Sequence, residues 1–135
     1  MSDKNLISEI QKCLLTNPKI VSAYILGSYT SGRAKNESDF DLAVVVEKKT
    51  NITQDQVYDL ISKINFPKDL DLSLVDKTSS PIFLFQIIST GRCIYQRSQN
   101  DKVNFEAFVL RKYYDTQHIR NIYYSYLKEK FPYAN

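Results

Sequence analysis

The stretch that decides the fold of this chain is residues 27–46, GSYTSGRAKNESDFDLAVVV. It follows an apolar run, IVSAYIL at residues 20–26, and it ends in a second one, LAVVV. Both runs are short and rich in β-branched residues, which predicts two buried strands joined by a polar loop. Asp39 and Asp41 stand at the start of the second run, and carboxylates two residues apart in an extended chain point to the same side. The pair can therefore reach one divalent cation.

Gly27 and Ser28 form the turn that leaves the first predicted strand. Glycine tolerates unusual backbone angles, and a turn of this kind can direct backbone N–H groups at phosphates. Phosphates on one side and paired carboxylates on the other are what a metal-assisted phosphoryl transfer requires. An Asp-x-Asp pair alone is weak evidence, because such pairs also occur in caps and turns before ordinary strands.

A third carboxylate strengthens the functional interpretation. Residues 69–75, DLDLSLV, alternate so that the leucines face one side and the polar residues the other. A charged residue inside a strand needs a partner, and a metal ion shared with Asp39 and Asp41 would supply one. Asp71 is preferred because it lies further inside the strand, and Asp69, which shares its face, stays an alternative.

The rest of the chain alternates predicted helices and strands. Apolar spacing, capping residues and helix-breaking residues predict a helix at residues 3–15, a second from a capping box at Thr53 and Gln56 to before Pro67, and a third from Ser80-Pro81 to Gly91. A strand is predicted at residues 92–96. One long helix or two consecutive helices are predicted from there up to residue 130. The predicted fold is of the α/β (α+β) class: a small mixed β-sheet with helices on one face and a long C-terminal helical segment. We expect a single domain over residues 1–135, with its core in 1–97 and the helical segment in 98–130.

Composition fits an ordinary globular protein, with 43% apolar and 24% charged residues among 135. No apolar run approaches the roughly 20 residues of a membrane span, and the N-terminus lacks the apolar core of a signal peptide. Cys13 and Cys93 are interpreted as reduced interior residues, so we expect a cytoplasmic protein without membrane association. A single histidine argues against a histidine-based zinc site.

The net charge of +3 lies in the C-terminal segment, because residues 1–96 carry 11 basic and 11 acidic side chains, whereas residues 97–135 carry 7 and 4. This excess suits an acidic or nucleotide-bearing partner but is too small to indicate direct nucleic-acid binding.

The order Gly-Ser, ten residues, Asp-x-Asp and a later strand Asp resembles the signature of DNA-polymerase-β-like nucleotidyltransferases. Residues 27–46 are similar to the minimal members of that superfamily, the MntA-type antitoxins of HEPN/MNT toxin–antitoxin pairs. The resemblance covers roughly residues 20–96 and includes the segment SPIFLFQIISTGRCIY. It implies a nucleotidyltransferase-like fold for the whole of this region.

The resemblance also implies a role for each matching residue. Gly27 and Ser28 would hold the nucleoside triphosphate, Asp39 and Asp41 would bind two Mg²⁺ ions, and Asp71 would complete this site. Asp71 would also help to deprotonate the attacking hydroxyl. The implied reaction transfers AMP from ATP to a tyrosine of a partner HEPN ribonuclease toxin, which would silence the toxin.

Further loop residues are candidates for nucleotide contacts. Ser38 either caps the loop or touches a metal-bound phosphate. Arg33 and Lys35 are candidates for contacts to phosphates or to the partner, and solvated loop cations are the equally simple interpretation.

Residues 105–130, FEAFVLRKYYDTQHIRNIYYSYLKEK, contain five of the ten tyrosines: Tyr113, Tyr114, Tyr123, Tyr124 and Tyr126. Arg111 and His118 match the loose Arg-(4–6)-His spacing of HEPN ribonucleases, but about 35 residues cannot build a HEPN helical bundle. A helix rich in tyrosine and arginine suits a protein interface, where these residues are enriched.

Two other functions stay open at this point. One is an antitoxin that neutralises by binding alone, with a vestigial site. The other is a nucleotidyltransferase acting on a small molecule or an RNA end, although such enzymes usually carry an additional substrate domain.

Overall fold

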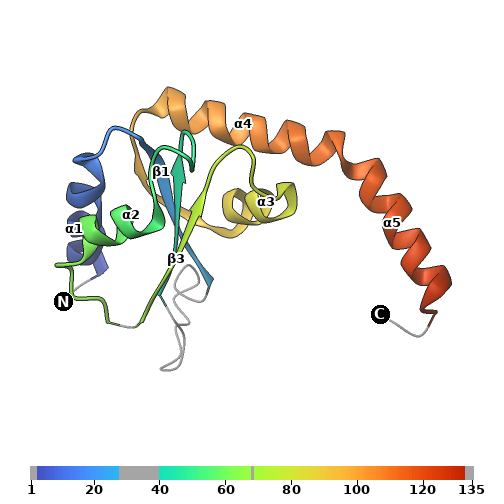
Figure 1. The fold of residues 1–135 in the computed structure, drawn as a ribbon, viewed down its shortest axis with the longest axis horizontal. Coiled ribbons are helices and arrows are strands. Elements are labelled where there is room, and N and C mark those ends of the chain that lie inside the picture. The colour runs from blue at the N-terminus through green and yellow to red at the C-terminus, as the bar shows by residue number, and fades with distance from the viewer. Residues whose placement is uncertain (1–2, 28–39, 68, 133–135) are drawn as a thin grey trace.

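The computed structural model describes residues 3–27, 40–67 and 69–132. The elements are α1 (Asp3–Leu15), β1 (Ile20–Leu26), β2 (Phe40–Val46), α2 (Gln54–Ile61), β3 (Leu70–Val75), α3 (Pro81–Thr90), β4 (Arg92–Gln96), α4 (Gln99–Asp115) and α5 (Gln117–Lys130). Within these residues the strands form one sheet in the order β3-β2-β1-β4. β1 is antiparallel to both of its neighbours, whereas β2 and β3 are parallel. The predicted mixed sheet is confirmed, and β4 lies at one of its edges (Figure 1).

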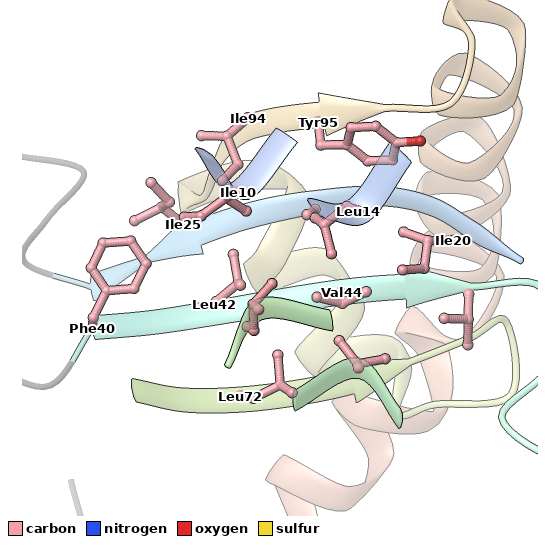
Figure 2. Close-up of a cluster of buried hydrophobic side chains, with 14 of the residues drawn as sticks. Ile10, Leu14, Ile20, Ile25, Phe40, Leu42, Val44, Leu72, Ile94 and Tyr95 are labelled. Carbon is pink, nitrogen blue, oxygen red and sulfur yellow. The ribbon is translucent and has the colours of Figure 1, made fainter. Parts of the chain in front are cut away.

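The first core lies between the sheet and the helices α1 and α2. Figure 2 shows Ile10 and Leu14 of α1 above a row of strand side chains that includes Leu42 and Val44 of β2. All four of these side chains are fully buried. The capping box predicted at the start of α2 is present, because Thr53 and the Gln56 side chain exchange hydrogen bonds with each other's backbone N–H groups.

A second core lies on the opposite face of the sheet. It contains Tyr24 of β1, Val45 of β2, Leu84 and Ile87 of α3, and Phe105 of α4. The prediction that helices cover only one face is therefore wrong. The physical reason lies in β1 and β2, whose side chains are apolar on both sides and so require cover on both.

Helix α4 is tied to the central strand β1 by a hydrogen bond inside this second core. The hydroxyl of Tyr24 donates to a carboxylate oxygen of Glu106 at 2.6 Å. Burial, together with this hydrogen bond to Glu106, raises the pKa of Tyr24 above its ordinary value. The phenol therefore stays protonated and satisfied, which a buried hydroxyl requires.

The C-terminal helical region consists of two helices rather than one. The break falls at Thr116, whose hydroxyl donates to the carbonyl of Lys112 at 2.9 Å and whose own carbonyl accepts from the N–H groups of Ile119 and Arg120. Figure 1 shows α5 turning away from the line of α4 and leaving the body of the molecule. No helix among the described residues is both long and apolar enough to cross a membrane.

The two cysteines are free and half-buried, as predicted. Cys13 packs against the first core and Cys93 against the second. Burial raises the pKa of the Cys93 thiol.

Gly91 marks the tight passage from α3 into β4. Its φ of −79° is ordinary, so the helix does not end through a left-handed residue. Glycine is required here for space: a Cβ atom would overlap the carbonyl oxygen of Ile87 and would lie 2.8 Å from Cδ2 of Leu26. The bare backbone lets the end of α3 lie directly on β1.

We predict that Gly91→Ala lowers the free energy of unfolding by about 2 kcal/mol, because a backbone oxygen cannot move aside as a side chain could. Urea denaturation of the two proteins measures the difference. Gln86→Ala is the control, since Gln86 is an exposed residue of the same helix. A loss below about 0.5 kcal/mol for Gly91→Ala would show that the contact relaxes freely.

Candidate active site at the end of the central strands

The parallel register of β2 and β3 places two carboxylates side by side. Asp41 is paired with Asp71 across this ladder, and Asp41 is paired with Leu26 on the β1 side. The pairing of Asp41 with Asp71 requires long-range strand contacts that neither sequence motif contains. The two acidic residues therefore come together through the sheet itself.

Both carboxylates extend from the same face of the sheet. In β2, Phe40 and Leu42 belong to the first core, so Asp41 between them projects toward the face covered by α3 and α4. In β3, Leu72 belongs to the first core, so Asp71 projects with Asp41. Asp41 is half-buried and Asp71 is exposed, which leaves the pair open to a ligand from solvent.

Gly27 lies against Asp41, one member of this pair. It has a φ of +73°, in the left-handed region that favours glycine, and a Cβ atom placed on it would lie 2.9 Å from Oδ2 of Asp41. The turn predicted to approach phosphates is thus in direct proximity to a predicted metal ligand. Gly27, Asp41 and Asp71 form the described part of the site.

Asp69, the alternative third carboxylate, has a different position. It is exposed and precedes β3, and its backbone carbonyl accepts a hydrogen bond from the N–H of Phe40 at 2.8 Å. Asp69 therefore helps to align the starts of β2 and β3. Asp71, two residues further on, has Asp41 as its ladder partner.

Several of the predicted site residues lie outside the described part of the chain: Asp39, Ser28, Ser38, Arg33 and Lys35. Their assignments stay predictions. Within residues 3–27, 40–67 and 69–132, no group of three or more His, Cys, Asp or Glu side chains is placed to hold a metal ion. The described portion contributes two carboxylates from a predicted set of three.

The sheet also brings Arg92 to this end of the molecule, a residue that no sequence motif singles out. Arg92 begins β4 and is paired with Ile25, one residue before Leu26. Its side chain is exposed and starts from the face opposite the two carboxylates, because Ile25 belongs to the first core. Its position could be found only from the antiparallel pairing of β4 with β1.

Two strand carboxylates beside a glycine turn are typical of a nucleotidyltransferase, and a comparison with protein families identifies the class. The family model described as "Polymerase beta, Nucleotidyltransferase" matches residues 8–100, which is more than half of the chain. The chain belongs to this family. The match covers every element from α1 to the start of α4 except the first residues of α1.

Among individual proteins, the chain is similar to the protein adenylyltransferase MntA of Shewanella oneidensis. The two are 29% identical over 116 residues, which cover 84% of this chain and 78% of that protein. The name of this relative describes an enzyme that transfers an adenylyl group to a protein.

Solved structures share the fold. One is a crystal structure of a toxin–antitoxin with AMP-PNP, with a TM-score of 0.70 and 22% identity, covering 93% of this chain and 98% of that one. Another is a tri-AMPylated Shewanella oneidensis HEPN toxin in complex with MNT antitoxin, with a TM-score of 0.70, 21% identity and the same coverage. These likenesses confirm the nucleotidyltransferase-like fold and extend it over nearly the whole chain.

We predict that Gly27→Ala lowers the free energy of unfolding by roughly 2 kcal/mol, because alanine disfavours a left-handed φ and its Cβ would press on the Asp41 carboxylate. In an Asp41→Ala background the second cause disappears, so the cost of Gly27→Ala should fall to about 1 kcal/mol. A double-mutant cycle by chemical denaturation measures this coupling. Equal costs in both backgrounds would contradict the close approach of Gly27 to Asp41.

Proposed function

We propose that this chain is a protein adenylyltransferase that transfers AMP from ATP to a tyrosine of a HEPN-family toxin and thereby neutralises it. The observation that carries the proposal is the convergence of Gly27, Asp41 and Asp71 at one end of the sheet in a member of the nucleotidyltransferase family. Similarity to a protein named protein adenylyltransferase MntA supports the reaction. Similarity in fold to antitoxins solved with AMP-PNP and with an AMPylated HEPN toxin supports ATP and the partner.

The donor set fits Mg²⁺. The described ligands are carboxylates, the hard oxygen donors that Mg²⁺ prefers, and Asp39 would add a third carboxylate of the same kind. We assign two Mg²⁺ ions to Asp39, Asp41 and Asp71. When bound, the ions would neutralise charge on the triphosphate and increase the acidity of the attacking hydroxyl.

Gly27 would present the backbone to the phosphates. Glycine has no side chain, so at φ +73° the backbone of Gly27 can lie close to a charged group. The carboxylate oxygen Oδ2 of Asp41 already lies near it. Ser28, Ser38 and Arg33 are proposed to complete the nucleotide contacts. Asp41, which is half-buried, would hold Mg²⁺ in a defined place, because packing limits its side-chain rotamers.

The reaction itself is a displacement at phosphorus. The tyrosine oxygen of the toxin forms a bond to the α-phosphorus of ATP, the bond from that phosphorus to the bridging oxygen breaks, and pyrophosphate leaves with the bridging oxygen. The phenolic proton passes to a carboxylate, for which we assign Asp71. Asp71 is exposed, so a protein acceptor can reach it from solvent.

An ATP-dependent reaction and two free cysteines fit a cytoplasmic location.

We predict that Asp41→Asn and Asp71→Asn each lower the rate of AMP transfer at least about 100-fold, since amides are poor ligands for Mg²⁺ and poor proton acceptors. Asp69→Asn is the matched control and should retain most activity, because Asp69 contacts Phe40 through its backbone carbonyl, which the substitution keeps. Purified protein, labelled ATP, Mg²⁺ and a HEPN-family toxin form the assay. Mass spectrometry locates the AMP on the acceptor, and removal of Mg²⁺ by a chelator should stop the transfer.

The variants also separate the alternative functions. An Asp41→Asn protein that still neutralises the toxin fully would show an antitoxin that acts by binding alone. Label found on RNA or on an aminoglycoside, and absent from the toxin, would reassign the acceptor. Loss of activity in Asp69→Asn but not in Asp71→Asn would exchange the roles of these two residues.

A further inference from the structure

Helix α5 carries an apolar face that nothing in the described chain covers. Ile119, Ile122, Tyr123 and Tyr126, which we name the α5 stripe, follow the i, i+3, i+4, i+7 spacing that puts side chains on one side of a helix. They are 57%, 68%, 57% and 53% exposed, and no described residue of α5 is buried. An amphipathic stripe normally packs against a core, so this one is built for a surface outside the described chain.

The α5 stripe is large enough to mark an interaction site. Four side chains that each expose more than half of roughly 200 Å² present on the order of 450 Å² of surface on one side of one helix. A patch of this size is comparable to the largest apolar patch of a typical monomer, which is often functional. Two of its members are tyrosines, which are enriched in the centres of protein interfaces.

The base of α5 is nevertheless held in place. Arg120 donates hydrogen bonds to the carbonyl of Tyr113 at 2.6 Å and to the hydroxyl of Thr116 at 2.7 Å, and its guanidinium lies 3.8 Å from the centre of the Tyr113 ring. The Tyr113 ring in turn stacks on Phe85 of α3, with centroids 3.9 Å apart. These contacts link α3, α4 and α5, so the angle at which α5 leaves α4 is fixed although its stripe is free of the core.

The attachment of α5 relates it to the candidate active site. The base of α5 is held beside α3 through the Tyr113–Phe85 stack, and α3 covers the face of the sheet from which Asp41 and Asp71 extend. Figure 1 shows α5 then leaving the body of the molecule. Asp71 is the second residue of β3, and Asp41 is its ladder partner. A protein that contacts both α5 and α3 would therefore meet the face of the sheet that carries the carboxylate pair.

Charge decides between the occupants of this surface. α5 contains Arg120, Lys128 and Lys130 against Glu129, a net charge of 3 − 1 = +2, whereas residues 1–96 are neutral. Lys130 lies 5.9 Å from the ring of Tyr126 and so borders the stripe. Two copies of a basic helix would repel each other, whereas an acceptor with acidic residues around an apolar groove would be attracted.

We propose that the α5 stripe is the docking surface for the acceptor protein and that it delivers the acceptor tyrosine to the Asp41–Asp71 end of the sheet. This inference rests on the proposed function and adds the surface that selects the substrate. The acceptor is inferred to carry an apolar groove with an acidic rim.

The experiment compares two double variants that leave the net charge unchanged. Ile122→Gln/Tyr126→Gln removes the centre of the α5 stripe, and Asn121→Gln/Ser125→Gln introduces the same residue at exposed positions on the other side of α5. We expect the stripe variant to raise KM for the toxin at least about tenfold, and the control to stay within about twofold of the unchanged protein. Mg²⁺·ATP affinity should be equal in all three proteins, because the stripe makes no contact with the site.

A second measurement needs no variant. Hydrogen exchange of the unchanged protein should show amides of α5 protected on addition of the toxin, and raising the salt concentration should weaken the complex. An unchanged KM in the stripe variant, or absence of protection in α5, would overturn the inference. So would a dimer of this chain alone that the stripe variant disrupts, because the surface would then belong to a second copy.

The two proposals fail in different ways. If the unchanged protein transfers no AMP to the toxin, the proposed function fails. If it transfers AMP and the stripe variant does so equally well, the function stands and only the docking surface is wrong.

Discussion

The parallel pairing of β2 with β3 is the constraint on which the rest of the structure depends. Parallel neighbours cannot be joined by a tight turn, so the chain crosses over through α2, which packs beside α1 on one face. β3 and β4 then lie at opposite edges, and α3 between them crosses the other face. The same pairing sets Asp41 beside Asp71. The pairing of β2 with β3 therefore determines both how helices cover the two faces of the sheet and that Asp41 lies beside Asp71.

Most of the secondary structure could be predicted from residues that are close together in the sequence. The composition of the strands also indicated a second layer of helices. Strand ends, the capping box at Thr53 and the break near Gly91 depend on neighbouring residues alone, so they could be predicted. β1 and β2 are continuous apolar runs rather than alternating ones, which is typical of strands buried on both faces. Their composition thus indicated helices on both sides, although we expected one. No glycine or proline marks the bend at Thr116 in the sequence. The bend depends on contacts of Arg120 with Tyr113.

Part of the candidate site could be predicted, because some of its features also depend only on residues that are close together in the sequence. Local spacing indicated Asp41, and Asp71 was preferred over Asp69 because it lies further inside the strand, although alternation puts both on one face. Contact of Gly27 with Asp41 and the arrival of Arg92 at the same end depend on pairing between distant strands. No single-sequence pattern contains that register. The tyrosine-rich composition of the C-terminal helices indicated an interface, but which side of α5 stays exposed could not be predicted, since an apolar stripe looks the same whether or not a core covers it.

The two cores share β1 and β2, and this sharing has a consequence for cooperativity. Alternate residues of each strand enter opposite clusters, so neither helical layer can detach without exposing the same two strands. The sheet and its four packed helices should therefore unfold in one transition. α5 enters neither cluster and can unwind locally at little cost to that unit. The chain thus combines a cooperative catalytic body with an independently opening terminal helix.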